Sequence, residues 1–168
     1  MGISELAVLL AGFALAHAAW SISDVPRDEL LTPLAFLQNA NGERQLLRFA
    51  SETQAEAIAA GTDTTRKLIG SATVWALARE GLVAIEGPKV DVLAIDLWGP
   101  GMDRPITVLQ QFSPAWGAAG FRVIGEPRIV IDGHLQPTAS VAGLVSLIHD
   151  GIREHAHAGT LWDTWQTH

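Results

Sequence analysis

The fold class can be predicted from residues 74–131, which read VWALAREGLVAIEGPKVDVLAIDLWGPGMDRPITVLQQFSPAWGAAGFRVIGEPRIVI. Four segments of this stretch are rich in β-branched and aromatic residues, a composition typical of strands: 74–79, 90–98, 106–112 and 121–131. Short segments rich in Gly and Pro separate the four, and connections of this length join antiparallel neighbours. The stretch therefore predicts a four-stranded antiparallel meander.

The residues on either side of the meander predict helices and a hairpin. Residues 6–22 are almost wholly apolar, and residues 140–155 carry an apolar stripe at helical spacing. Asn-Gly at 41–42 separates two apolar runs, which predicts a β-hairpin over 34–49. Ser51 is expected to cap a helix that weakens at Gly61, and Trp162 and Trp165 suit a last helical turn that folds back. We therefore expect one α+β domain over residues 1–168, with a mixed, mainly antiparallel sheet packed on helices.

The expected order is helix, hairpin, helix, meander and helix. This element order resembles that of the cone-shaped fold of nuclear transport factor 2 and ketosteroid isomerase, with an additional C-terminal helix. The resemblance rests on element order, so it carries over no catalytic residue. It implies a fold in which a pocket can form between the sheet and the helices.

Composition excludes several classes of protein. Hydrophobic residues make up 48% of the 168 residues and charged residues 17%, which excludes a disordered chain. A net charge of −7 argues against a surface that binds nucleic acid, because such a surface is basic. The chain has no cysteine, which excludes disulfides, thiolate metal sites and a cysteine nucleophile.

The apolar segment 6–22 allows two interpretations. It ends near Ala16-His17-Ala18, which resembles a signal-peptidase site, so a targeting segment or a short membrane span is one reading. No Lys or Arg precedes the segment, and it is short for a span. Its small residues would let another backbone approach closely, so we expect a buried helix in a cytoplasmic protein without a membrane partner.

Alternation along the meander sorts its side chains into two faces. One face is nearly all aliphatic or aromatic and is expected to meet the helices. The other face mixes apolar and charged residues, a composition typical of a surface that pairs with another subunit or lines a ligand cleft. Turn positions predict that Arg79 lies opposite Asp96, Asp96 opposite Thr107, Gln111 opposite Arg122 and Thr107 opposite Glu126. The candidate interface residues on the mixed face are Trp75, Leu77, Arg79, Asp96, Trp98, Leu109, Gln111 and Arg122.

Few residues indicate catalysis. Asp96 interrupts an apolar run, so it is either a general base or substrate anchor, or the partner of Arg79 in a structural ion pair. His155 and His157 lie near other possible ligands, but side chains two apart on a helix point about 200° from each other, so we expect a solvated helix end and no metal. No nucleophile elbow or phosphate-binding loop is present, and no cofactor is expected.

The sequence therefore predicts a non-catalytic module that associates through the mixed face, either with a second copy as a homodimer or with another protein. The alternative is a small-molecule-binding protein or enzyme with a pocket between the sheet and the helices. The sequence indicates no substrate, no reaction and no catalytic residue.

Overall fold

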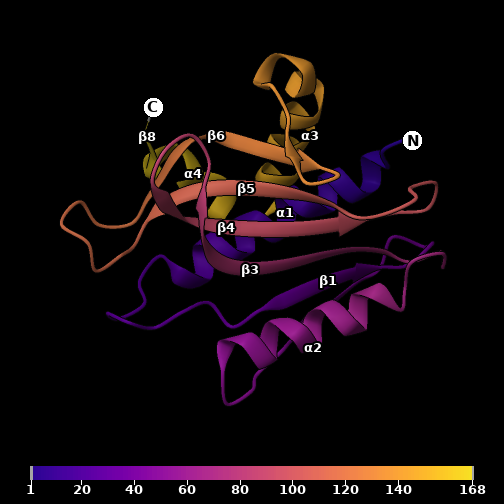
Figure 1. Ribbon diagram of the computed structural model, residues 1–168, viewed down its shortest axis with the longest axis horizontal. Coiled ribbons are helices and arrows are strands. Elements are labelled where there is room, and N and C mark those ends of the chain that lie inside the picture. The colour runs from indigo at the N-terminus through magenta and orange to yellow at the C-terminus, as the bar shows by residue number, and fades with distance from the viewer. Residues whose placement is uncertain (1, 168) are drawn as a thin grey trace.

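The structure is a computed structural model that describes residues 2–167, and it has the expected α+β class (Figure 1). Seven strands form one sheet in the order β2-β1-β3-β4-β5-β6-β7, and β8 pairs with β6 in parallel, so the sheet is mixed and mainly antiparallel. The elements are α1 (Glu5–Ile22), β1 (Leu34–Gln38), β2 (Arg44–Arg48), α2 (Gln54–Arg66), β3 (Val74–Ala84), β4 (Lys89–Trp98), β5 (Ile106–Ser113), β6 (Arg122–Ile131), β7 (His134–Leu135), the 3₁₀ helix η1 (Thr138–Val141), α3 (Ala142–Glu154), α4 (Ala158–Trp165) and β8 (Gln166–Thr167).

The hairpin is confirmed as the start of the sheet. β1 pairs with β2 on one side and with β3 on the other, both antiparallel. Gly42 in the connecting turn has φ +82°, a left-handed conformation that glycine adopts without steric cost. The hairpin therefore extends the meander into a wider sheet, as the Asn-Gly turn predicts.

The predicted register between β3 and β4 is wrong by two residues. Arg79 lies opposite Ala94, and Leu77 lies opposite Asp96, because the chain turns around Glu86 and Gly87. Side chains alternate with a period of two, so this error leaves every residue on its predicted face. The next register is confirmed, with Asp96 opposite Thr107.

A bulge changes the register between β5 and β6. Leu109 lies opposite Arg128 but Gln111 lies opposite Ile124, so three residues of β6 face the single residue Gln110. The buried Gln110 side chain stabilises the bulge, since its Nε2 donates to the carbonyl oxygens of Ile124 and Gly125 at 3.1 Å each. The predicted pairings of Gln111 with Arg122 and of Thr107 with Glu126 are therefore wrong, and Thr107 lies opposite Val130 instead.

The predicted core face is covered by α1, which lies behind the sheet in Figure 1 and packs against α3. Glycines allow the two helices to touch through their backbones. A Cβ on Gly12 would lie 2.1 Å from the carbonyl oxygen of Ile148, and one on Gly151 would lie 2.0 Å from that of Leu9. The small residues of α1 thus allow α3 to approach closely, as the sequence predicts for a neighbouring backbone.

The small-residue face of α1 is its buried face. Its alanines are 0–1% exposed, whereas Leu6 and Trp20 in the large-residue stripe are 55% and 38% exposed. By length and composition α1 is apolar enough to cross a membrane, yet 61% of it is buried inside the protein, as in core helices of soluble proteins. The predicted helix is confirmed within a fold of soluble type, and the cytoplasmic location stays a prediction.

The opposite face of the sheet is partly covered by α2, which lies below β1 in Figure 1 and contacts β1 and β3. Thr53, and not Ser51, caps this helix, because its side chain accepts a hydrogen bond from the Glu56 N–H. The helix continues through Gly61, where a Cβ would lie 2.8 Å from Leu77 Cδ1. Gly61 is therefore a contact point with the sheet rather than a weak point of the helix.

The C-terminal segment forms more structure than the sequence predicts. The chain turns at residues 155–157 and begins the separate helix α4, whose Trp162 and Trp165 are buried as expected of a turn that folds back. β8 then pairs with β6, and the small strand β7 adds to the far edge. The pairing of β8 holds the end of the described chain beside β6.

Candidate functional site

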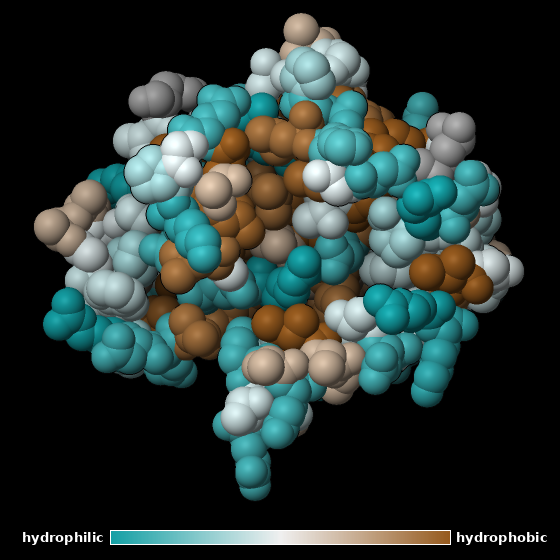
Figure 2. Space-filling view, in the orientation of Figure 1, coloured by the Kyte–Doolittle hydropathy of each residue, from teal (hydrophilic) through white to brown (hydrophobic). Residues whose placement is uncertain are grey.

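Part of the mixed face is open. No helix of residues 2–167 lies over β4, β5 and β6 on the side that faces the viewer in Figure 1. Figure 2 shows this region as a hollow in which brown, hydrophobic side chains surround a teal, polar group. We call this region the open face and define it by side chains that point to the same side of the sheet: Arg79, Val92, Ala94, Asp96, Thr107, Leu109, Gln111, Arg122, Ile124 and Arg128.

The structure divides the predicted interface residues into two groups. Trp75, Leu77 and Trp98 are 2%, 1% and 2% exposed, so they belong to the interior of the subunit. α2 covers Leu77, and the indole of Trp98 donates to the Met102 carbonyl of the next turn at 2.9 Å. The other five residues are half-buried on the open face: Arg79, Asp96, Leu109, Gln111 and Arg122.

Asp96 forms the structural ion pair that is one of its two predicted roles. Its carboxylate accepts from Arg79 Nη1 at 2.5 Å and from Thr107 Oγ1 at 2.6 Å. Both of its oxygens thus have a donor within the chain, and the Asp96 and Arg79 side chains are 21% and 29% exposed. A carboxylate that is held by an arginine in this way suits a structural role better than proton transfer.

A cleft of about 440 Å³ adjoins the open face where the β3–β4 turn curls toward β6. Its walls include Ile85, Val90 and Ile124, which are half-buried. Arg128 and Glu86 close one side of the cleft with an ion pair of 2.8 Å. Glu126, the third charged group of the lining, contacts His149 at 2.6 Å instead. The apolar wall of the cleft continues the apolar part of the open face.

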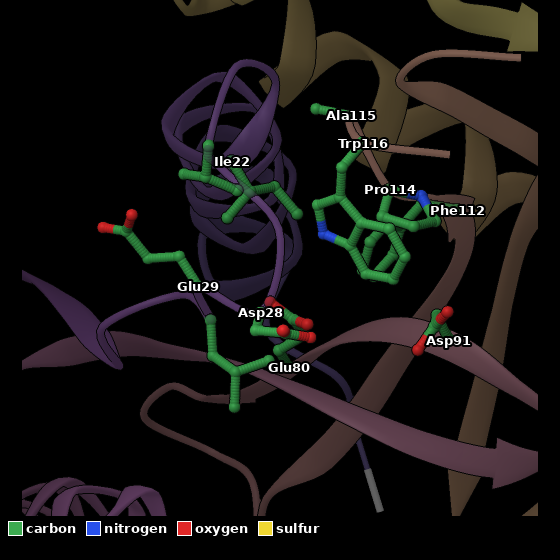
Figure 3. A pocket seen from close by; sticks show the side chains of 11 residues that line it. Ile22, Asp28, Glu29, Glu80, Asp91, Phe112, Pro114, Ala115 and Trp116 are labelled. Atoms are coloured by element: carbon green, nitrogen blue, oxygen red, sulfur yellow. The ribbon is translucent and has the colours of Figure 1, made fainter. Parts of the chain in front are cut away.

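A second cleft, of about 320 Å³, lies on the other side of the sheet, beyond the end of α1. Figure 3 shows the indole of Trp116 on one side of the cleft and the carboxylates of Asp28, Glu80 and Asp91 on the other. Burial raises the pKa of Glu80, and the negative charge of Asp91 raises it further. The Leu31 N–H, which donates to the Glu80 carboxylate at 3.0 Å, acts in the opposite direction and lowers the pKa. The cleft is a pocket between the sheet and a helix, as the alternative function requires.

Two histidines that line neither cleft contact each other. His17 on α1 and His155 after α3 face each other, with 3.0 Å between Nδ1 and Nε2. Nδ1 of His155 accepts the backbone N–H groups of His157 and Ala158, so its proton lies on Nε2 and is donated to His17. Burial lowers the pKa of both histidines, that of His17 to about 4, with the charges of His155 and Arg48 acting in the same direction.

The C-terminal histidines have different surroundings from those that the sequence predicts. His155 is 6% exposed, so the predicted solvated helix end is wrong for this residue. Its two ring nitrogens are used by the backbone and by His17, and His157 stacks on Trp20 with 4.6 Å between ring centroids. His149 instead contacts Glu126 at 2.6 Å. Among residues 2–167 no group of three potential ligands converges, and the absence of a metal stays a prediction.

Comparison with known proteins gave no match to a protein family, to a curated protein or to a solved structure. The candidate sites are therefore described by their own geometry. Sequence reasoning missed the Trp116 cleft and the histidine pair, because each joins residues that are far apart in the chain.

Proposed function

We propose that this protein is a non-catalytic module that self-associates through the open face. The observation that supports the proposal is that the part of the mixed face over β4, β5 and β6 has no covering helix in the described part of the chain, although α1 covers the other face of the sheet. Leu109 and Ile124 are half-buried there and keep part of their apolar surface accessible, and the apolar walls of the adjoining cleft extend the patch. Contiguous patches of this kind are uncommon on monomers and mark interaction sites.

The charges of the open face favour a second copy as the occupant. The chain carries a net charge of −7, so most faces of two copies repel each other. The open face differs, because Arg79 pairs with Asp96, and Arg128 pairs with Glu86. A second copy can therefore cover these two arginines without leaving their charges unpaired, which is the main cost of burying ions. Arg122 at the margin donates to the Phe121 carbonyl oxygen at 3.0 Å.

The size of the face is also compatible with a dimer. Three strands of about ten residues occupy a rectangle of about 500 Å² at the usual strand spacing and rise. A standard interface removes about 800 Å² from each partner, and side-chain relief together with the adjoining cleft supplies the difference. Pairing about a two-fold axis would place Leu109 near the centre of the interface.

The test compares two substitutions of a leucine by aspartate. Leu109→Asp puts a charge in the middle of the open face, whereas Leu82→Asp changes a side chain that is already 63% exposed near the end of β3. Light scattering after size exclusion should give a monomer for Leu109→Asp and a dimer for Leu82→Asp. Leu77→Asp is unsuitable, because Leu77 is 1% exposed and a buried charge there would unfold the chain.

A milder variant separates loss of association from loss of folding. Gln111→Lys adds a charge at a half-buried position of the open face without changing an apolar contact of the core. It should also weaken the dimer while the circular dichroism spectrum stays that of the wild type. Folded Leu109→Asp and Gln111→Lys variants that both remain dimeric would overturn the proposal.

The second candidate function is binding of a small molecule in the Trp116 cleft. The specific observation in its favour is a cleft of about 320 Å³ between the sheet and the end of α1, with carboxylates opposite an aromatic ring. A volume of this size lies at the lower end of the range for ligand pockets. Direct titration with small molecules tests this function separately from self-association.

A further inference from the structure

The walls of the Trp116 cleft indicate an organic ligand. Most of its lining side chains are apolar, and they come from α1, from the segment after it, from β5 and from the β5–β6 connection. Such walls gain little from a hydrated metal ion and bind a ligand with its own apolar surface. The apolar members of the lining are Ile22, Val25, Leu30, Phe112, Pro114, Ala115 and Trp116.

The polar members of the lining all carry the same charge. They are Asp28, Glu29, Glu80 and Asp91, and no Lys, Arg or His of residues 2–167 lines the cleft. Figure 3 shows the carboxylate of Glu29 pointing away from the others, so three carboxylates face the ligand space. α1 also ends at Ile22 beside the cleft, and the carbonyl end of a helix carries a partial negative charge.

Trp116 already contacts a cation of the chain itself. The guanidinium of Arg27 lies over the indole, 5.3 Å from the ring centroid. Aromatic faces attract cations in this way, most strongly when the faces are partly desolvated. Arg27 and Trp116 are both exposed, so an external cation with an apolar body can compete for the ring.

We propose that the Trp116 cleft binds an organic ammonium compound, with its charge between the carboxylates of Asp28, Glu80 and Asp91 and its apolar body against Trp116 and Phe112. This inference rests on the second candidate function and names its ligand class. Three carboxylates with no basic side chain among the described lining residues reject an anion, and the apolar walls favour an ammonium ion on a hydrophobic group over a bare one. Burial of Glu80 makes its charge a stronger determinant of affinity than an exposed carboxylate would be.

Three probes of similar size separate charge from shape: 2-phenylethylammonium, 2-phenylethanol and phenylacetate. Each is titrated into the full chain labelled with ¹⁵N, and the indole N–H signal of Trp116 is followed after assignment with Trp116→Phe. The ammonium compound should shift this signal and bind at least about tenfold more tightly than the alcohol. Phenylacetate should leave the signal unchanged, and added salt should weaken the ammonium complex.

Conservative variants then test the carboxylates. Glu80→Gln keeps an oxygen that accepts the Leu31 N–H, so the local fold is preserved while the charge is lost. Combined with Asp91→Asn, it should weaken the ammonium compound about tenfold and leave 2-phenylethanol unchanged. Glu52→Gln removes an exposed carboxylate just before α2, outside the lining of the cleft, and should change neither affinity.

The experiment distinguishes a wrong ligand class from a cleft that binds no small molecule. Equal binding of the alcohol and the ammonium compound, or an unchanged ammonium affinity in the Glu80→Gln, Asp91→Asn variant, would overturn the ligand class and leave a small-molecule cleft. If no probe shifts the Trp116 signal, both this inference and the second candidate function fail.

Discussion

The contact between His17 and His155 predicts a specific loss of stability in acid. Both rings are neutral in the fold, because Nδ1 of His17 faces the Nε2 proton of His155, and Nδ1 of His155 faces two backbone N–H groups. A proton added to either ring would meet another donor. The folded state therefore binds fewer protons than the unfolded chain as the pH falls below the ordinary pKa of histidine.

The size of the stability loss follows from the pKa of His17, which drops from 6.5 to about 4 on folding. The sign is that of a lowered pKa: stability is complete above pH 6.5 and decreases as the pH falls toward 4. The full shift would remove just under 2 kcal/mol between about pH 7 and pH 5. Partial exposure of His17 reduces this to about 1 kcal/mol, which lowers the melting temperature by about 2–4 °C.

The assay is thermal unfolding at several pH values between 7 and 5, followed by circular dichroism. His17→Phe removes the titrating ring, and its melting temperature should fall less over this range than that of the wild type. Its absolute stability is expected to drop as well, because the Nε2 proton of His155 loses its acceptor, so the pH dependence is the quantity compared. His134→Gln, at an exposed position, serves as control and should follow the wild-type curve. Parallel curves for the wild type and His17→Phe would refute the reasoning.

Two further predictions concern the packing of α1. Gly151→Ala would place a Cβ 2.0 Å from the carbonyl oxygen of Leu9 and should cost at least about 3 kcal/mol, whereas Gly143→Ala, with open space around it, should cost less than about 1 kcal/mol; urea unfolding measures both. Equal effects of the two alanines would contradict the backbone contact. Deletion of residues 1–19 removes most of the helix that covers the sheet and should leave insoluble protein, so a truncated chain as soluble and heat-stable as the full one would show that α1 is dispensable.

The sheet could be predicted from the sequence because its determinants are local. The Asn-Gly turn at 41–42 set the hairpin, and turns rich in Gly and Pro separated the four strands of the meander. Alternation assigned the core face correctly even where the register was wrong, since both errors moved a strand by an even number of residues. The bulge had a local signal that was not used: Gly125 and Pro127 within a strand are typical of such an irregularity.

The candidate sites depend on contacts between segments that are distant in the sequence, so local sequence patterns could not predict them. The coverage of Trp75 and Leu77 depends on where α2 lies, and alternation does not specify that. His17 and His155 are 138 residues apart, and nothing in their neighbouring sequence indicates the contact. The Trp116 cleft likewise joins the segment after α1 to the β5–β6 connection.

The central claim, self-association through the open face, is tested most directly by the molar mass of the unmodified protein in solution. Sedimentation equilibrium at about 100 µM lies well above the micromolar dissociation constant expected of a functional interface of this size. The account predicts twice the chain mass of 17.9 kDa, with dissociation on dilution. A mass of 17.9 kDa at all concentrations would contradict it and leave small-molecule binding at the Trp116 cleft as the remaining proposal.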